Sequence, residues 1–113
     1  MIEQIRPADL AQWLARERAH GEPVVLDVRE PWEWQTASVT ADGFELLKMP
    51  MASIPARLAE LDRDRPVACL CHHGGRSMQV AHFLAQAGFG HVANIAGGIN
   101  AWSSEVDPGV PRY

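Results

Sequence analysis

The chain has 113 residues, a length that suits one domain with a hydrophobic core of its own. Apolar residues make up 47% of the chain and charged residues 21%, which are ordinary proportions for a globular protein. The formal net charge is −4 at pH 7 and no run of Lys and Arg stands out, so nucleic acid and anionic membranes are poor candidates as partners. No apolar run approaches the length of a membrane span, and residues 1–4 do not resemble a signal peptide.

Short apolar runs alternate with helical patterns along the chain. In chain order they predict a strand at 2–5, a helix at 7–18, a strand at 24–28, a helical turn at 31–36, a helix at 54–61, a strand at 67–71, a helix at 78–87, a strand at 91–95 and a last helical segment at 97–104. Residues 37–48 show only a turn signal at Asp42-Gly43, and residues 106–113 predict an irregular tail. The alternation predicts an α/β fold with a parallel sheet and helices on both of its faces.

The stretch from Cys71 to Ser77 directly follows the buried strand at 67–71. Gly74 and Gly75 permit backbone angles that other residues resist, so this loop can curl and point several N–H groups inward. Ser77 suits an N-cap of the next helix. We therefore expect Cys71 at the rim of a ring of backbone donors, beside the positive end of a helix dipole and within reach of solvent.

These surroundings favour the thiolate of Cys71, because a helix N-terminus, Arg76 and a protonated His72 or His73 would all stabilise an anion. We interpret Cys71 as a nucleophile that carries a covalent intermediate, with a buried structural cysteine as the alternative. Cys69 would lie on the same face of the strand, as a buried and inert thiol.

The two cysteines are too close in sequence for a sound structural disulfide, and they form neither a Cys-x-x-Cys redox motif nor a zinc site. His72 and His73 adjoin Cys71, but the side chains of adjacent residues usually diverge. We therefore expect no metal and no cofactor. A reducing, cytoplasmic location suits free thiols.

Three stretches resemble the rhodanese family, the sulfurtransferases that carry sulfur as a cysteine persulfide. Cys71–Ser77 resembles the family's active-site loop, which has Cys, two variable residues, Gly, one variable residue, Arg, and then Ser or Thr. Residues 25–34 resemble the first signature of the family and residues 97–102 its closing one. The resemblance implies a single rhodanese-like domain over residues 1–113, with a five-stranded, mainly parallel sheet.

The resemblance also implies a two-step transfer through Cys71. The cysteine would take sulfur from a donor such as thiosulfate, and an acceptor such as cyanide, a small thiol or a protein cysteine would remove it. The substrate-binding residues would be those of the loop, namely His72, His73, Gly74, Gly75, Arg76 and Ser77. Their N–H groups would hold the outer sulfur, and the two histidines would flank the mouth of the pocket.

Arg76 has two possible roles in this scheme: it contacts the anionic donor, or it braces the loop from behind, as the resemblance favours. Asp27 and Arg29 would support the loop, with Asp27 as the partner of Arg76. Trp102 is expected to pack in the core. A monomer is the default expectation.

Two other functions stay open. A Cys-based phosphatase or arsenate reductase uses a similar loop, but related phosphatases place five residues between Cys and Arg, whereas four separate Cys71 from Arg76. Some rhodanese-like domains are binding or regulatory modules that have lost the cysteine. The complete loop in this chain favours an enzyme over such a module.

Overall fold

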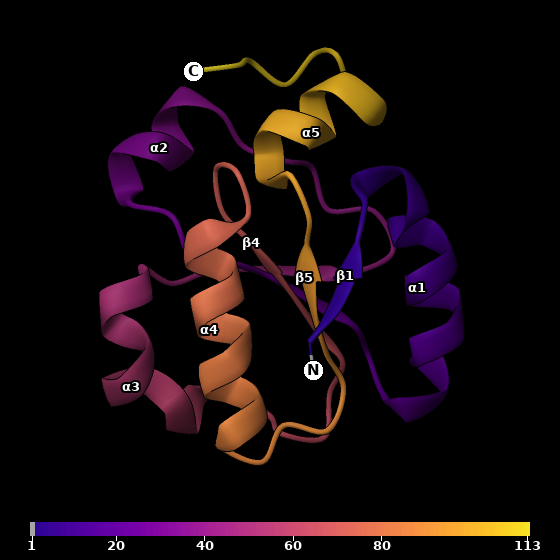
Figure 1. The fold of residues 1–113 in the computed structure, drawn as a ribbon, viewed down its shortest axis with the longest axis vertical. Coiled ribbons are helices and arrows are strands. Elements are labelled where there is room, and N and C mark those ends of the chain that lie inside the picture. The colour runs from indigo at the N-terminus through magenta and orange to yellow at the C-terminus, as the bar shows by residue number, and fades with distance from the viewer. Residues whose placement is uncertain (1) are drawn as a thin grey trace.

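The computed structural model describes residues 2–113, which form a sheet with helices on both faces (Figure 1). Within this range the strands are β1 (Glu3–Ile5), β2 (Val24–Asp27), β3 (Glu45–Lys48), β4 (Val67–Leu70) and β5 (Val92–Ile95). The α-helices are α1 (Leu10–Glu17), α2 (Pro31–Thr36), α3 (Ile54–Arg57), α4 (Gly75–Gln86) and α5 (Gly98–Glu105). Short 3-10 turns adjoin α1 and α3, at Pro7–Asp9, Arg18–His20, Met51–Ser53 and Leu58–Glu60.

The strands form one sheet in the order β1-β5-β4-β2-β3, and every neighbouring pair is parallel. The predicted α/β fold with a five-stranded sheet is confirmed. β2 and β4 are buried along their whole length, as their apolar runs predicted, because helices cover both faces of the centre of the sheet.

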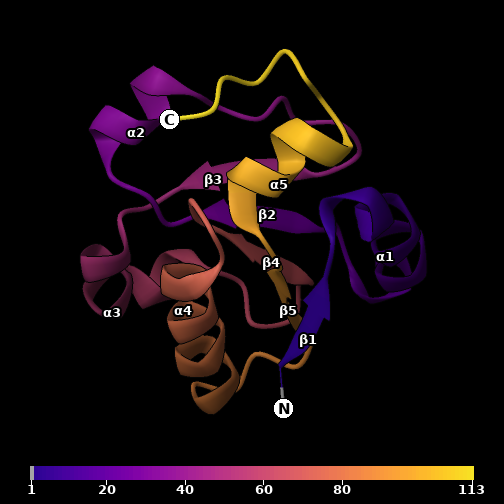
Figure 2. The same cartoon turned by 45° about the horizontal axis from the view of Figure 1, so that its top comes forward.

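Two apolar clusters hold these layers together. One packs α1 and α5 onto the first face of the sheet and includes Trp13 and Trp102. The other packs α3 and α4 onto the opposite face and includes Ile54 and Leu84. Figure 2 shows α1 on one side of the strands and α3 and α4 on the other. Trp102 is therefore a core residue, as expected.

The helix after β4 begins earlier than predicted. Gly74 is its N-cap, with a φ of 106°, and α4 starts at Gly75. The prediction that Ser77 is the N-cap is wrong, because Ser77 lies inside the first turn and turns its hydroxyl elsewhere. At 12 residues α4 is the longest helix among residues 2–113, and none of the helices there could span a membrane.

The carboxyl ends of parallel strands meet at one edge of a sheet, and here several connections converge at that edge. The chain leaves β2 for α2, β4 for the Cys71 loop, and β5 for the Gly97-Gly98 turn. The chain after α5 returns over the same edge and ends near α2 (Figures 1 and 2). The fold thus brings four distant segments together around Cys71.

Candidate active site

Cys71 is the first residue after β4, and the loop to α4 wraps around its sulfur. The backbone N–H of Gly74 donates to Sγ of Cys71 at 3.1 Å, and the thiol donates to Oγ of Ser77 at 3.2 Å. The positive φ of Gly74, which favours glycine, makes this turn possible. Gly75 is an ordinary helical residue, and a Cβ there would meet nothing within 4 Å. Of the amides at 73–77 in the described chain, that of Gly74 is the one bonded to the sulfur.

The Cys71 side chain is buried, not open at a rim, since only 1% of the residue's surface is exposed. The expectation of a solvent-accessible sulfur is wrong for this conformation. The reason lies in α5, whose first turn packs against the loop. Ile99 N–H donates to the carbonyl of Cys71 at 2.9 Å, and Asn100 N–H donates to the carbonyl of His72 at 3.1 Å. A reactant can reach the sulfur only if part of this rim moves.

Gly98 makes this close approach possible. Its φ is 58°, and a Cβ at this position would overlap the carbonyl oxygens of Cys71 and His72. Glycine at 98 is therefore a steric requirement of the site. The Gly97-Gly98 pair therefore allows the first turn of α5 to pack against the Cys71 loop.

Ser77 extends the polar contacts of the sulfur into the sheet. Its buried hydroxyl donates to Oδ1 of Asn94 at 2.5 Å. The side-chain amide of Asn94 donates to the carbonyl of Gly74 at 3.2 Å and to Gln4 at 2.9 Å. Asn94 was not singled out from the sequence, although a lone amide inside the apolar run at 91–95 was a usable signal.

Arg76 points its guanidinium at Glu33 of α2. Its two Nη atoms donate to the two carboxylate oxygens of Glu33 at 2.7 and 2.8 Å, an arrangement that strengthens the ion pair. These bonds lower the pKa of Glu33 to about 2 and raise the pKa of Arg76. The prediction that Asp27 pairs with Arg76 is wrong. The contact with Glu33 directs the Arg76 side chain to α2, which suits a residue that holds the loop in place from behind.

Glu33 was not predicted as a site residue, because it combines a local role in α2 with a contact to a distant residue. It is the third residue of α2, and its carboxylate accepts the N–H of Glu30, which closes a capping box. That local signal was visible in the sequence. The contact with Arg76, 43 residues away, was not.

Asp27 and Arg29 pair with each other and are both fully buried. The guanidinium of Arg29 donates to Asp27 at 2.7 Å and also to the carbonyls of Glu33 and Ala37, at 3.2 and 2.9 Å. This pair fixes the chain between β2 and α2. The pair is linked to the Cys71 loop through Glu33, which accepts from Arg29 and from Arg76.

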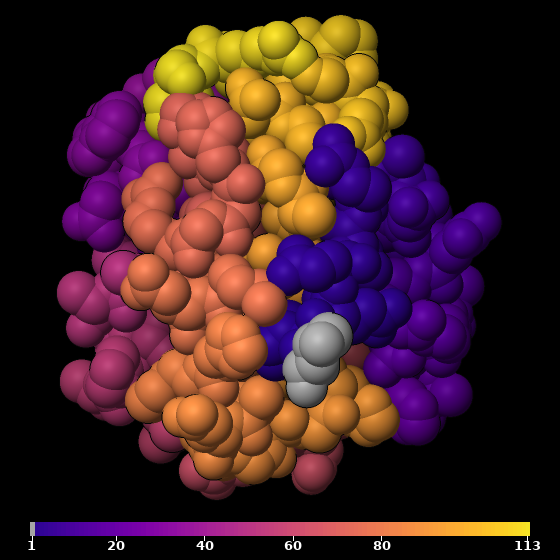
Figure 3. Space-filling model, viewed as in Figure 1, coloured from indigo at the N-terminus to yellow at the C-terminus, as the bar shows by residue number. Residues whose placement is uncertain are grey.

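Tyr113 brings the tail into the site. Its hydroxyl donates to Glu33 at 2.8 Å and accepts a bond from Arg29 at 3.0 Å. Its ring stacks on His72, with centroids 3.9 Å apart and planes 8° apart, and His72 stacks in turn on His73 at 3.9 Å. The two histidines therefore lie together, contrary to the expectation that they diverge. In Figure 3 the end of the chain lies against the β4–α4 loop at the surface.

The two histidines have different surroundings. His72 is half-buried, whereas His73 is exposed. Burial, with a further contribution from His73, lowers the pKa of His72, so its neutral form is favoured near pH 7. An anionic donor would gain less from His72 than the sequence suggested.

Cys69 belongs to the same apolar cluster as Cys71, as expected for two positions on one face of a strand. Both thiols are free. Burial raises the pKa of Cys69, and the nearby sulfur of Cys71 adds to this effect. These features describe an inert thiol.

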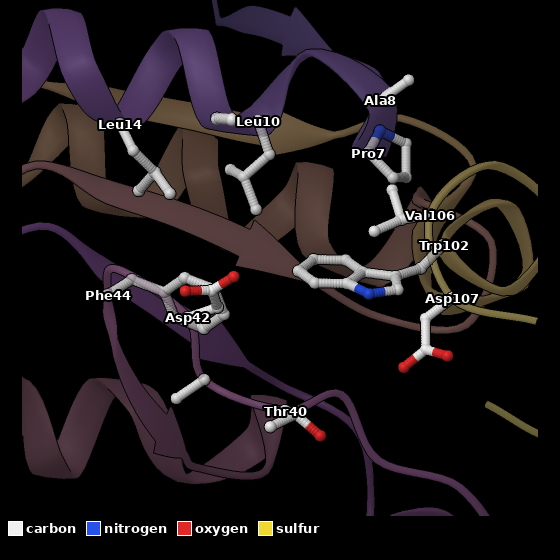
Figure 4. Close-up of a pocket in the computed structure, with 12 residues that line it drawn as sticks. Pro7, Ala8, Leu10, Leu14, Thr40, Asp42, Phe44, Trp102, Val106 and Asp107 are labelled. Carbon is white, nitrogen blue, oxygen red and sulfur yellow. The ribbon is translucent and has the colours of Figure 1, made fainter. Parts of the chain in front are cut away.

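A cavity of about 520 Å³ lies away from this loop, between α1, α5 and the connection to β3 (Figure 4). Apolar side chains dominate its lining, and two carboxylates join them: Leu10, Leu14, Phe44, Trp102, Val106, Asp42 and Asp107. In Figure 4 the Trp102 ring lies between Leu10 and Asp107. None of its lining residues comes from the Cys71 loop.

Glu17, His20 and His91 are the one group among residues 2–113 whose ligand atoms lie close enough for a shared metal ion, within 4.8 Å of one another. The rings of His20 and His91 are stacked 3.9 Å apart and nearly parallel. A metal lies in the plane of each imidazole that binds it, so both rings would have to tilt to share an ion. The site around Cys71 does not involve this group.

Known proteins that are similar to this chain in sequence and structure identify its family. The sequence model of the rhodanese-like domain family matches residues 10–105. This chain belongs to that family. The solved structure of a rhodanese-related protein from Thermoplasma volcanium superposes on this rhodanese-like domain with a TM-score of 0.77 and 31% identity, covering 98% of this chain and 99% of the other.

Curated relatives of the domain include both short and long proteins. A sulfurtransferase from Allochromatium vinosum is 35% identical over 103 residues, which cover 91% of this chain and 90% of the relative. The chloroplastic Rhodanese-like/PpiC domain-containing protein 12 of Arabidopsis thaliana is 42% identical over 94 residues, or 81% of this chain. The chain spans only 31% of the length of that second relative. A relative similar over nearly its whole length thus supports sulfur transfer as an activity within the family.

Proposed function

We propose that this protein transfers sulfane sulfur from a donor such as thiosulfate to a thiophilic acceptor through a persulfide on Cys71. The Cys71 thiolate attacks the outer sulfur of thiosulfate, the S–S bond of the donor breaks, and sulfite leaves with the electron pair. The acceptor, cyanide or a thiol, then attacks the outer sulfur of the persulfide. The bond between the two sulfurs breaks, and the thiolate of Cys71 is restored.

The main support for this proposal is the arrangement of polar groups around the sulfur of Cys71. Cys71 has the N–H of Gly74 at 3.1 Å, the hydroxyl of Ser77 at 3.2 Å, and the start of α4 beside it. The N–H of Gly74 and the start of α4 favour negative charge on sulfur. The Ser77 hydroxyl accepts the thiol proton in this structure, and it can donate to the thiolate only by turning away from Asn94. Preorganised donors of this kind contribute roughly 3 kcal/mol at a catalytic step.

The position of Arg76 supports sulfur transfer over phosphate chemistry. A phosphatase loop uses its arginine to hold the oxyanion, but both Nη atoms of Arg76 are bonded to Glu33. The loop also has four residues between Cys71 and Arg76, one fewer than in the related phosphatases. Measurable, Cys71-dependent turnover of an aryl phosphate would contradict this choice.

Proteins with accessible cysteines are candidate acceptors as well as small thiols. A reducing, cytoplasmic setting would keep Cys69 and Cys71 as the free thiols that the mechanism needs. We propose this location and a monomeric state together with the activity.

Initial rates with thiosulfate and cyanide test the mechanism. With both concentrations varied, the two-step exchange gives parallel double-reciprocal lines, and Cys71→Ser lowers the formation of thiocyanate to background. Cys69→Ser is the matched control and should keep nearly full activity. Intersecting lines, or equal losses in the two variants, would contradict the proposal.

A further inference from the structure

The tail after α5 lies beyond residue 105, where the match to the family ends, yet it is firmly attached. Val110 is buried in the cluster that packs α1 and α5 onto the sheet. The hydroxyl of Ser103 donates to the carbonyl of Val110 at 2.7 Å. These contacts hold the tail against the protein and deliver Tyr113 to the Cys71 loop.

The hydroxyl of Tyr113 joins the side chains of two ion pairs that otherwise meet through the Glu33 carbonyl, which accepts from Arg29. It accepts a bond from Arg29, whose partner is Asp27, and it donates to Glu33, whose partner is Arg76. The phenol therefore connects the carboxyl end of β2 to the start of α4. The Glu33–Arg76 pair behind the loop is therefore in contact with the tail as well as with α2.

The ring of Tyr113 has a second contact, with the residue next to the nucleophile. His72 lies between the rings of Tyr113 and His73, with a centroid separation of 3.9 Å on each side. The Nε2 atom of His72 is buried without a hydrogen-bond partner within residues 2–113. Nε2 therefore gives His72 no hydrogen bond within these residues, and the ring is held by the stack and by a hydrogen bond with the Tyr113 backbone.

We propose that Tyr113 is a positioning residue of this site, which holds His72 and the Glu33–Arg76 pair and closes one side of the rim around Cys71. Another part of the rim is backbone, since α5 donates to the carbonyls of Cys71 and His72. The stack consists of side chains that can rotate away without breaking those backbone bonds. The size of the reactant that reaches Cys71 is therefore set by Tyr113.

The test compares two thiol reagents, iodoacetamide as the small probe and a maleimide-linked dye as the bulky one. The rate of modification of Cys71 is followed by peptide mass spectrometry in the full chain. Tyr113→Ala should raise the ratio of the bulky to the small rate by about fivefold, the size expected from the loss of one aromatic stack. Tyr113→Phe keeps the stack and should stay within about twofold of the original ratio.

Arg112→Ala is the matched control, because Arg112 is an exposed neighbour in the same tail, and it should leave the ratio unchanged. An unchanged ratio in Tyr113→Ala would overturn the proposal. So would an equal rise in both rates, which indicates general loosening. If Tyr113→Ala does not fold, Tyr113→Leu, which also lacks the planar stack, should give the same rise.

This inference rests on the proposed function only in naming sulfur transfer as the reaction that Tyr113 serves. The alkylation ratio needs no sulfur donor, so its outcome is independent of persulfide formation. A changed ratio in a protein that cannot be loaded with sulfur would contradict the proposed function and leave the role of Tyr113 intact.

Discussion

Cys69 in β4 and Cys71 just after it show that neighbouring groups, and not burial alone, decide how readily a thiol ionises. Cys69 and Cys71 are both buried and belong to the same apolar cluster. Burial raises the pKa of Cys69. Cys71 instead receives an N–H from Gly74 and contacts the hydroxyl of Ser77. The proposal that Cys71 is the nucleophile therefore rests on the Gly74 N–H and the start of α4 beside its sulfur, and not on burial.

Ser77 offers a direct test of this argument at the level of one residue. Ser77→Ala removes the hydroxyl beside Sγ and leaves Asn94 without its donor. Once Cys71 ionises, its sulfur no longer donates, and the Ser77 hydroxyl is a group beside it that can turn to donate to the anion. Losing that donor costs about 1–2 kcal/mol, so we expect Cys71 to react with iodoacetamide about tenfold more slowly at neutral pH.

Ser104→Ala is the matched control for this experiment. Ser104 is exposed on α5 and bonds only to the carbonyl of Asn100 within the described chain. Its removal should leave the alkylation rate unchanged. Equal rates for the Ser77 and Ser104 variants would refute the role given to Ser77.

The elements that matter most to the site are the first turns of α4 and α5, which meet at the carboxyl edge of the sheet. α4 begins beside the sulfur, while α5 binds the carbonyls of Cys71 and His72 with its free N–H groups. These contacts use N–H groups that a helix cannot satisfy internally. Glycine at the start of each helix allows these contacts. Gly74 supplies the positive φ before α4, whereas Gly98 leaves room for the carbonyls of Cys71 and His72.

Gly98→Ala should lower the stability of the protein far more than Gly75→Ala. A Cβ at 98 would overlap two carbonyl oxygens in a left-handed conformation, so we expect a loss of about 3 kcal/mol in the free energy of unfolding. A Cβ at 75 meets nothing, and the change there should stay within about 1 kcal/mol. Urea unfolding measures both. A Gly98→Ala protein as stable as the Gly75→Ala protein would show that α5 does not dock as described.

At the scale of the whole molecule, two buried or half-buried ion pairs link segments that the sheet does not join. Asp27 with Arg29 fixes β2 to α2, and Glu33 with Arg76 fixes α2 to α4. Tyr113 ties both pairs to the tail. Removing one member would leave its partner desolvated and unpaired, which is more costly than losing an exposed pair.

The Glu33–Arg76 pair predicts how stability depends on acidity. The pKa of Glu33 in the folded protein is about 2, below its usual value of 4.5, so the folded state binds this proton less readily than the unfolded state does. The stabilisation is present above pH 4.5 and is lost as the pH falls toward 2. Glu33→Gln should flatten the fall in the free energy of unfolding across this range, measured by urea titration at each pH.

Glu60→Gln is the control for this effect, because Glu60 forms an exposed pair with Arg57. Its profile should stay close to that of the unchanged protein, since exposed pairs contribute little. A Glu33→Gln profile with the same slope as the unchanged protein would contradict the proposed contribution of Glu33.

The sequence was most informative where local patterns decide the structure. β2 and β4 are apolar runs buried on both faces, and Gly74 marks a turn that needs a positive φ. β3 escaped prediction because its ends are exposed and its centre is half-buried, so its residues show no clear alternation. Short-range order could be predicted for the other strands, including the edge strand β1, but not for β3.

The misassigned parts of the site depend on contacts between distant segments. Arg76 and Tyr113 bind Glu33 although they are 43 and 80 residues away from it in the sequence. No local sequence pattern predicts either contact. The burial of Cys71 follows from the docking of α5, which the Gly97-Gly98 pair permits but does not reveal. The place of Cys71 at the end of a buried strand was predictable, whereas its partners and its exposure required the folded chain.

Mass spectrometry of the cysteine-containing peptide after treatment with thiosulfate tests the central claim most directly. We expect one added sulfur atom on Cys71 and none on Cys69, and we expect cyanide to remove that sulfur with formation of an equal amount of thiocyanate. A peptide that gains no sulfur, or one that carries it on Cys69, would contradict the account.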